Sequence, residues 1–188
     1  MRIIAGSLKG RRLRAPRWDG LRPSSDRLRE TLFNVLGEQV RDSVVLDGCA
    51  GTGALGIEAI SRGARHVVFA ECDNRATALI DENANRCGIA DRCRIVRGEL
   101  PDVIESGGLP ETFDVIMLDP PYDDPNIDGI LSAVGERLAS RGVLVLERTR
   151  RARPSVVVGL THVRRVTSGG SALDFYRQDG EAPAVTAR

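Results

Sequence analysis

The sequence predicts an α/β fold: a doubly wound, mostly parallel sheet of seven strands, resembling the dinucleotide-binding folds. Short apolar runs alternate with stretches of helical periodicity, glycine-rich turns separate them, and acidic residues end several of the runs. Strands that alternate with helices are typical of a parallel sheet covered by helices on both faces. The expected strands are 44–47, 66–71, 94–96, 113–119, 142–147, 162–166 and 172–176.

The expected helices follow from apolar spacing and from capping residues. Pro23-Ser24-Ser25-Asp26 is a helix-start signal, and one apolar helical face follows it, made of Leu28, Leu32, Val35, Leu36 and Val40. A second helix starts near Ala54, and Gly63 closes it. Two further helices are expected over 74–87 and 127–138. The last two strands flank Ser168-Gly169-Gly170-Ser171, which indicates a hairpin.

The chain divides into three predicted parts. Residues 1–20 form a small basic β-hairpin appendage, 21–178 the main domain, and 179–188 a tail with few apolar anchors that we expect to be disordered. The formal net charge is only +1, yet basic residues gather near the N-terminus and again at 148–153. A local basic patch on a neutral body can bind a polyanion by releasing counterions.

Composition excludes several classes of protein. The four cysteines, Cys49, Cys72, Cys87 and Cys93, have no CxxC spacing and no histidine cluster beside them, so we expect reduced thiols and no metal site. No apolar run is long enough to span a membrane, and the N-terminus lacks a signal-peptide core. The sequence is therefore read as a cytoplasmic protein with no membrane partner.

A glycine loop, Gly48-Cys49-Ala50-Gly51-Thr52-Gly53, follows the strand that ends in Asp47. Gly51, Gly53 and Gly56 fit the G-x-G-x-x-G pattern of dinucleotide sites, and Glu71 lies where a ribose-binding acid is expected. A dehydrogenase is therefore an alternative interpretation of this loop. Asp47 would repel a pyrophosphate but suits a cationic amine. An amino-acid moiety with a sulfonium centre, as in S-adenosylmethionine, fits the loop better.

A second motif, Asp119-Pro120-Pro121-Tyr122, follows the apolar run 115–118. Prolines cannot donate backbone hydrogen bonds and hold φ nearly fixed, so the turn is stiff and its carbonyls are expected to be free to accept. An acid, free carbonyls and a ring make a pocket for a flat group with an exocyclic amine. The acids at predicted strand ends, which should meet at one edge of the sheet, are Asp47, Glu71, Glu99 and Asp119.

These features together resemble the class I S-adenosylmethionine-dependent amino methyltransferases. The segment 22–34, with Arg2-Ile3-Ile4-Ala5-Gly6, Gly10-Arg11 and 172–176, is similar to the bacterial 16S ribosomal RNA guanine-N2 methyltransferase family RsmD. The resemblance covers nearly the whole chain. It implies methylation of a guanine in 16S rRNA, in the assembled small ribosomal subunit, with S-adenosylmethionine as cofactor and a monomeric enzyme.

The resemblance also implies residue roles. Asp47, Gly48, Gly51 and Gly53 would hold the methionine end of the cofactor, Glu71 with Cys72 the ribose, and Glu99 with Leu100 the adenine. The family usually has Asp where this chain has Glu99, which is a departure from its pattern. The guanine would be held by Asp119, Pro120, Pro121 and Tyr122. The RNA-binding candidates are Arg2, Lys9, Arg11, Arg12, Arg14, Arg22 and Arg27.

Three alternatives stay open at this point. An adenine-N6 or cytosine-N4 DNA methyltransferase shares the Asp-Pro-Pro-Tyr pocket chemistry. A dehydrogenase would need an acid/base, but His66 and His162 lie on predicted strands. A non-catalytic RNA-binding assembly factor would leave Asp119 and the glycine loop without a purpose.

Overall fold

A twisted seven-stranded sheet forms the centre of the computed structural model, which describes residues 1–16, 18, 25–105, 109–121 and 124–180. Its strand order is β3-β2-β1-β4-β5-β7-β6. The parallel strands are β1 (Val44–Gly48), β2 (His66–Glu71), β3 (Cys93–Arg97), β4 (Phe113–Leu118) and β5 (Leu138–Thr149). β7 (Ser171–Gln178) runs antiparallel to β5 and to β6 (Leu160–Ser168). The predicted doubly wound, mostly parallel sheet is confirmed.

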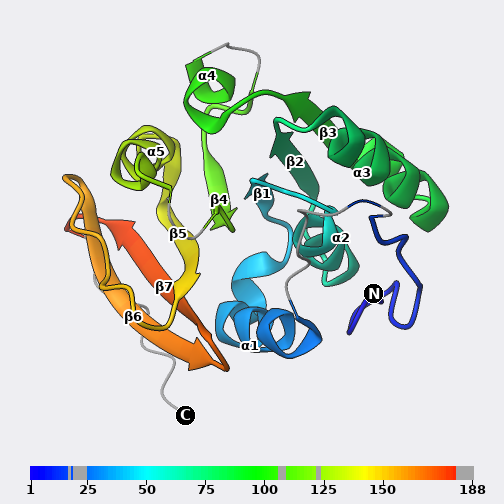
Figure 1. Cartoon of the computed structure of the whole chain (residues 1–188), viewed down its shortest axis with the longest axis horizontal. Helices are drawn as coiled ribbons and strands as arrows, with labels where there is room; N and C mark the ends of the chain where they lie inside the picture. The colour runs from blue at the N-terminus through cyan, green and yellow to red at the C-terminus, as the bar shows by residue number, and fades with distance from the viewer. Residues whose placement is uncertain (17, 19–24, 106–108, 122–123, 181–188) are drawn as a thin grey trace.

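Helices cover both faces of this sheet (Figure 1). One face carries α1 (Asp26–Leu36), α2 (Ala54–Ser61) and α3 (Asn74–Cys87), and the other carries α4 (Leu100–Glu105) and α5 (Ile127–Gly135). Strand side chains alternate between the two apolar cores, as the pleat of a strand requires. Met117 and Val145 pack on the α1 side, and Leu118 and Leu146 pack on the α5 side.

Local signals explain why the helices begin and end where they do. The Ser25 hydroxyl caps α1 by accepting from the Leu28 N–H at 3.2 Å, and the Asp73 carboxylate caps α3 through the Arg75 N–H at 2.7 Å. Gly88 ends α3 in the left-handed conformation, with φ of 68°. The predicted bounds of α3 are confirmed.

On the β4–β5 side, the structure corrects two predicted boundaries and adds one short helix. The expected helix 127–138 ends at Gly135, and Leu138 instead pairs with Phe113 and opens β5. The register between β4 and β5 shifts between Phe113 and Val115. The first residues of β5 continue the helical spacing of the sequence before them, so the sequence did not reveal them. The short helix α4 was not predicted, because six residues with Pro101 inside give almost no periodicity.

The N-terminal segment pairs as a minimal hairpin. The Ile3 N–H donates to the Arg11 carbonyl and the Gly10 N–H donates to the Ile3 carbonyl, both at 2.9 Å, around a single Arg2–Arg12 bridge. Its apolar side chains Ile3, Leu8 and Leu13 are buried in the core on the α1 side of the sheet. The segment therefore contributes to the main core. The division of the chain at residue 20 stays a prediction, and residues 181–188 of the expected tail lie outside the described residues.

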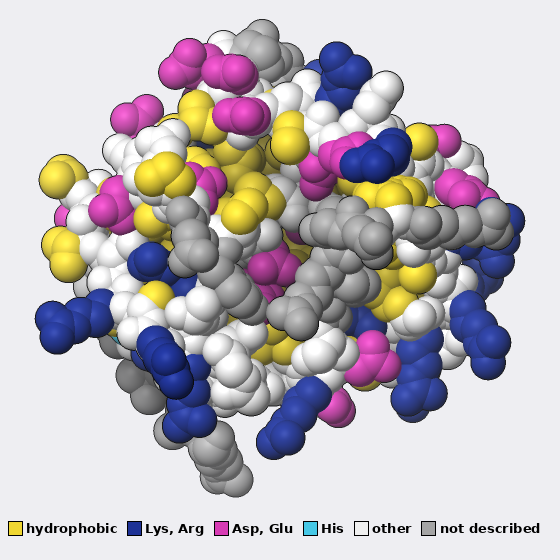
Figure 2. Space-filling view, viewed as in Figure 1, with side chains coloured by type: hydrophobic (Ala, Val, Ile, Leu, Met, Phe, Trp, Pro, Cys, Tyr) yellow, Lys and Arg dark blue, Asp and Glu magenta, His cyan; other side chains and the backbone are white. Residues whose placement is uncertain are grey.

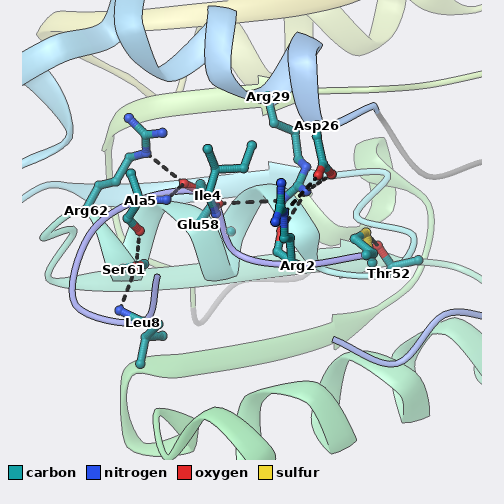
Figure 3. Close-up of polar contacts among 12 residues, drawn as sticks. Arg2, Ile4, Ala5, Leu8, Asp26, Arg29, Thr52, Glu58, Ser61 and Arg62 are labelled. Carbon is teal, nitrogen blue, oxygen red and sulfur yellow. Dashed lines mark hydrogen bonds and ion pairs between the residues drawn. The ribbon is translucent and has the colours of Figure 1, made fainter. Parts of the chain in front are cut away.

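Glu58 of α2 ties this segment to the helices (Figure 3). Its fully buried carboxylate accepts from the Ile4 N–H at 2.8 Å and the Ala5 N–H at 3.0 Å. It also accepts from Arg62 Nε at 2.9 Å and lies 3.5 Å from Nη1 of the buried Arg29 in α1. Because α2 starts at the glycine loop, this network joins the N-terminal hairpin and α1 to the loop. None of the described helices is long and apolar enough to cross a bilayer.

Candidate active site

The acids expected at one edge of the sheet do meet there. The order of the strands reverses between β1 and β4, and this is where doubly wound sheets bind ligands. Asp47 is the last residue but one of β1, Glu71 ends β2, and Asp119 directly follows β4. Their charges act on one another, since Asp119 and Glu71 both help to raise the pKa of Asp47. In the view of Figure 2, acidic side chains lie at the centre of the face of the molecule that is shown.

Asp47 is almost fully buried, with 1% of the residue exposed. Burial is the main cause that holds its pKa well above the usual 3.8, and the hydrogen bond from the Gly56 N–H to Oδ2, 2.7 Å long, acts in the opposite direction. The other carboxylate oxygen, Oδ1, is buried without a hydrogen-bond partner among the described residues. A buried, unsatisfied acceptor is costly. A cationic amine of a ligand would satisfy it.

The glycine loop is built from left-handed backbone. Gly51 and Gly53 have φ of 55° and 75°, and Gly53 is the N-cap residue of α2. Cys49 also has a positive φ, 59°, which nothing in the sequence indicates. Burial, followed by the charges of Glu71, Asp119 and Asp47, raises the pKa of its thiol to about 12.

Two glycines serve packing against neighbouring side chains. A Cβ on Gly48 would come within 2.6 Å of Leu118 and 2.9 Å of Leu100. A Cβ on Gly56 would lie 2.3 Å from the ring of Phe69. The third glycine of the G-x-G-x-x-G pattern therefore lets α2 approach β2 closely, as it does in dinucleotide folds. Leu100 is buried in the core on the α5 side and packs against Gly48.

Glu71 is held by the glycine loop and by the turn after β2. Its Oε2 accepts from the Gly51 N–H at 2.8 Å, and its Oε1 accepts from the Asp73 N–H at 2.9 Å. The thiol of the exposed Cys72 lies 3.6 Å from Oε1. The pKa of Cys72 is raised by partial burial, then by Glu71, with a smaller effect of the exposed Glu99. Glu71, Cys72 and Glu99 thus line the edge beside the loop.

The Asp119 turn lies against the loop. The Asp119 N–H donates to the Gly48 carbonyl at 3.4 Å, and Pro120 is buried while Pro121 is exposed. The expectation that both proline carbonyls are free was wrong for Pro121, whose carbonyl accepts from the Asp124 N–H at 3.1 Å and so closes the turn. Tyr122 lies outside the described residues.

The basic candidates near the N-terminus fall into two groups. Lys9, Arg12 and Arg27 are exposed, and the exposed Arg2 lies 3.6 Å from Asp26. Arg11 and Arg14 contact the protein itself: Arg11 donates to the Cys87 carbonyl at 3.0 Å, and Arg14 pairs with Glu82 at 2.7 Å. Arg22 lies outside the described residues.

The buried charges that the sequence did not single out include Arg29, Glu58 and Glu147. Nothing in the local sequence marks the first two, which pair with each other across α1 and α2. Glu147 carries the same signal as the other acids, because it ends the predicted strand 142–147. Within the described residues, no group of three or more His, Cys, Asp or Glu side chains could hold a metal ion.

A sheet with this strand order, with a glycine loop and converging acids at its switch point, places the protein among the class I methyltransferases. A family described as "Conserved hypothetical protein 95" matches residues 1–177. The chain is 30% identical to ribosomal RNA small subunit methyltransferase D of Escherichia coli, covering 96% of this chain and 91% of that protein. The chain belongs to this family, the RsmD family of methyltransferases.

Other relatives agree with this assignment. YlbH of Bacillus subtilis is 33% identical over 96% of this chain and 100% of its own length. The solved structure of YhhF from Escherichia coli has a TM-score of 0.81 and 29% identity, covering 96% of this chain and 99% of that one. A Salinibacter ruber RNA methyltransferase in complex with S-adenosyl-L-homocysteine has a TM-score of 0.64 at 20% identity, covering 89% of this chain and 100% of that one, which supports the fold alone.

Proposed function

We propose that the protein transfers a methyl group from S-adenosylmethionine to the exocyclic N2 amine of a guanine in 16S rRNA, acting as a monomer on the assembled small ribosomal subunit. The observation that carries this proposal is the convergence of Asp47, Glu71 and Asp119 on the glycine loop. Membership of the RsmD family supports ribosomal RNA as the substrate. Subunit assembly would place this activity in the cytoplasm.

The chemistry of the loop fits the proposed cofactor. When bound, S-adenosylmethionine supplies an electrophilic methyl group on a sulfonium centre. Asp47 offers a buried acceptor oxygen for the ammonium group, and Gly51 and Gly53 bring backbone close to the ligand. Glu71 is already oriented by two backbone N–H groups, and its remaining lone pairs can accept from ribose hydroxyls. Cys72, Glu99 and Leu100 are proposed to border the adenosine part.

Asp119 is the proposed catalytic residue. An exocyclic amine is a poor nucleophile, because its lone pair is delocalised into the ring. Hydrogen bonds from the amine to the Asp119 carboxylate and the Pro120 carbonyl would localise that lone pair on the nitrogen and orient it toward the cofactor site at the glycine loop. Positioning and electrostatics then account for most of the acceleration. The proton that the amine loses passes to Asp119 or to water.

The base must leave its stack to reach this pocket, at a cost of a few kcal/mol. Stacking on an aromatic ring returns about 1–3 kcal/mol, and Tyr122 is proposed for this role. Pro121 stiffens the turn through its contact with Asp124.

Two basic segments are proposed to hold the RNA. The first is the exposed set near the N-terminus: Arg2, Lys9, Arg12 and Arg27. The second is the connection after β5, where Arg150, Arg151 and Arg153 are exposed. This connection begins at the same edge of the sheet as Asp119, because β4 and β5 are parallel. Its backbone is held by Arg165, which donates to the Ala152 carbonyl at 2.6 Å.

The test is transfer of tritium from labelled S-adenosylmethionine to small subunits that lack the modification, with naked 16S rRNA and duplex DNA in parallel. Hydrolysis to nucleosides then identifies the product. The proposal predicts N2-methylguanosine from the subunits. Label only in adenine or cytosine of the DNA would contradict the substrate assignment and support a DNA methyltransferase, and no transfer to any substrate would contradict catalysis.

A further inference from the structure

Glu147 lies beside Asp119 at the edge of the sheet where the proposed reaction takes place. Leu118 of β4 pairs with Leu146 of β5, and Asp119 and Glu147 are the residues that follow this pair. Parallel neighbours are separated by about 4.8 Å. The two acids are therefore adjacent in the sheet.

The two side chains also leave the sheet on the same side. Side chains two residues apart in a strand share a face, and Val145 packs on the α1 side, so Glu147 starts on that side too. Asp119 comes two residues after Met117, which packs on the α1 side, and its N–H still donates to the Gly48 carbonyl of β1 at 3.4 Å, so the alternation of β4 continues to Asp119. Both carboxylates thus lie on the side of the sheet where the glycine loop enters α2.

Glu147 is buried, with 6% of the residue exposed. It lines a small cavity together with Arg29 of α1, Leu55 of α2 and Leu118 of β4. The cavity has a volume of about 10 Å³, which is room for a single water. The cavity is otherwise lined by apolar side chains, and the guanidinium of Arg29 supplies positive charge there. A buried acid that is fixed by packing discriminates between hydrogen-bond donors and acceptors more strongly than a mobile surface acid does, because an unpaired polar group is more costly there.

We propose that Glu147 selects guanine by accepting the N1–H of the base while Asp119 holds the amine; this rests on the proposed function. In guanine the exocyclic amine is flanked by the N1–H donor. In adenine and cytosine the atom beside the amine is a ring-nitrogen acceptor. A carboxylate facing an acceptor leaves both groups unpaired, so two adjacent carboxylates fit guanine and reject the other two bases.

Replacing Glu147 with Gln tests this assignment, because it changes one acceptor oxygen into a donor NH₂ at nearly constant size. The substrates are small subunits reconstituted with 16S rRNA that carries either guanine or 2-aminopurine at the methylated position. 2-Aminopurine keeps the amine, but its N1 is an acceptor. Wild-type enzyme should prefer guanine by at least about 100-fold in kcat/KM. Glu147→Gln should shift this ratio toward 2-aminopurine by at least about 100-fold.

Two controls separate recognition from folding. Glu147→Asp keeps the carboxylate and should keep the preference for guanine at a lower kcat/KM. Glu136→Gln, at an exposed acid after α5, should change nothing. The proposal is overturned if Glu147→Gln leaves the ratio unchanged. It is also overturned if wild-type enzyme methylates both bases equally, which requires no variant at all. In either case N2-methylguanosine would still form, so the proposed function would stand; its own failure would be wild-type enzyme that forms no N2-methylguanosine.

Discussion

Replacing Glu58 with Ala should destabilise the protein strongly. The change removes the carboxylate that accepts hydrogen bonds from the Ile4 and Ala5 N–H groups and from Arg62. It also removes one of the negative charges that pair with the fully buried Arg29. Breaking a buried charge pair from one side costs about 3–5 kcal/mol. Arg29 keeps its 2.7 Å contact with the half-exposed Asp26, so we expect the lower half of that range. For a chain of this length, each kcal/mol lowers the Tm by about 2–4 °C, which gives roughly 6–16 °C.

The assay is thermal unfolding followed by circular dichroism, with Glu82→Ala as the matched control. Glu82 also pairs with an arginine, Arg14, at 2.7 Å, but both side chains are more than 40% exposed. A surface ion pair contributes at most about 1 kcal/mol. Equal shifts in Tm for the two variants would refute the view that Glu58 anchors the N-terminal segment.

Three further predictions concern charge. A carboxyl whose pKa rises on folding takes away stability as the pH climbs above its unfolded value, 3.8 for Asp47. Asp47→Asn should therefore raise the Tm of the ligand-free protein by an amount that grows between pH 4 and pH 8, and it should weaken cofactor binding. A Tm difference between variant and wild type that does not change with pH would argue against a buried charged Asp47. Because the pKa of Cys49 is about 12, about one Cys49 thiol in 10⁴ is ionised at pH 8. Iodoacetamide should therefore alkylate the exposed Cys72 before Cys49, as followed by mass spectrometry. Alkylation of Cys49 first would contradict this prediction. Replacing both Lys9 and Arg12 with Ala should weaken subunit binding and lower the salt slope by about 0.7–0.9 per lost phosphate contact; an unchanged slope would remove them from the RNA surface.

The sheet could be predicted because its inner strands are continuous apolar runs that end in acids. Parallel strands finish at the same edge, so the meeting of Asp47, Glu71 and Asp119 followed from their positions alone. β5 was less visible. Its first residues follow a helical pattern, and only the pairing of Leu138 with Phe113 reveals the strand.

Other features depend on contacts between distant segments. The N-terminal segment looked like a separate basic hairpin, because its few apolar residues are spaced irregularly. Its backbone N–H groups at Ile4 and Ala5 donate to Glu58, which lies more than fifty residues away in sequence. For the same reason, deleting residues 1–20 would remove part of the core and would not isolate an effect on RNA binding. The left-handed backbone of Cys49 also could not be predicted, since only the path of the folded loop requires it.

The central claim is that Asp119 acts on the amine of the base while Asp47 and Glu71 hold the cofactor. The most direct measurement pairs calorimetric titration of S-adenosylhomocysteine with single-turnover methyl transfer to small subunits, for wild-type enzyme and Asp119→Ala. The account predicts an affinity within a few-fold of wild type and transfer reduced by at least about 100-fold. Transfer at the wild-type rate, or a parallel loss of binding and transfer, would contradict it.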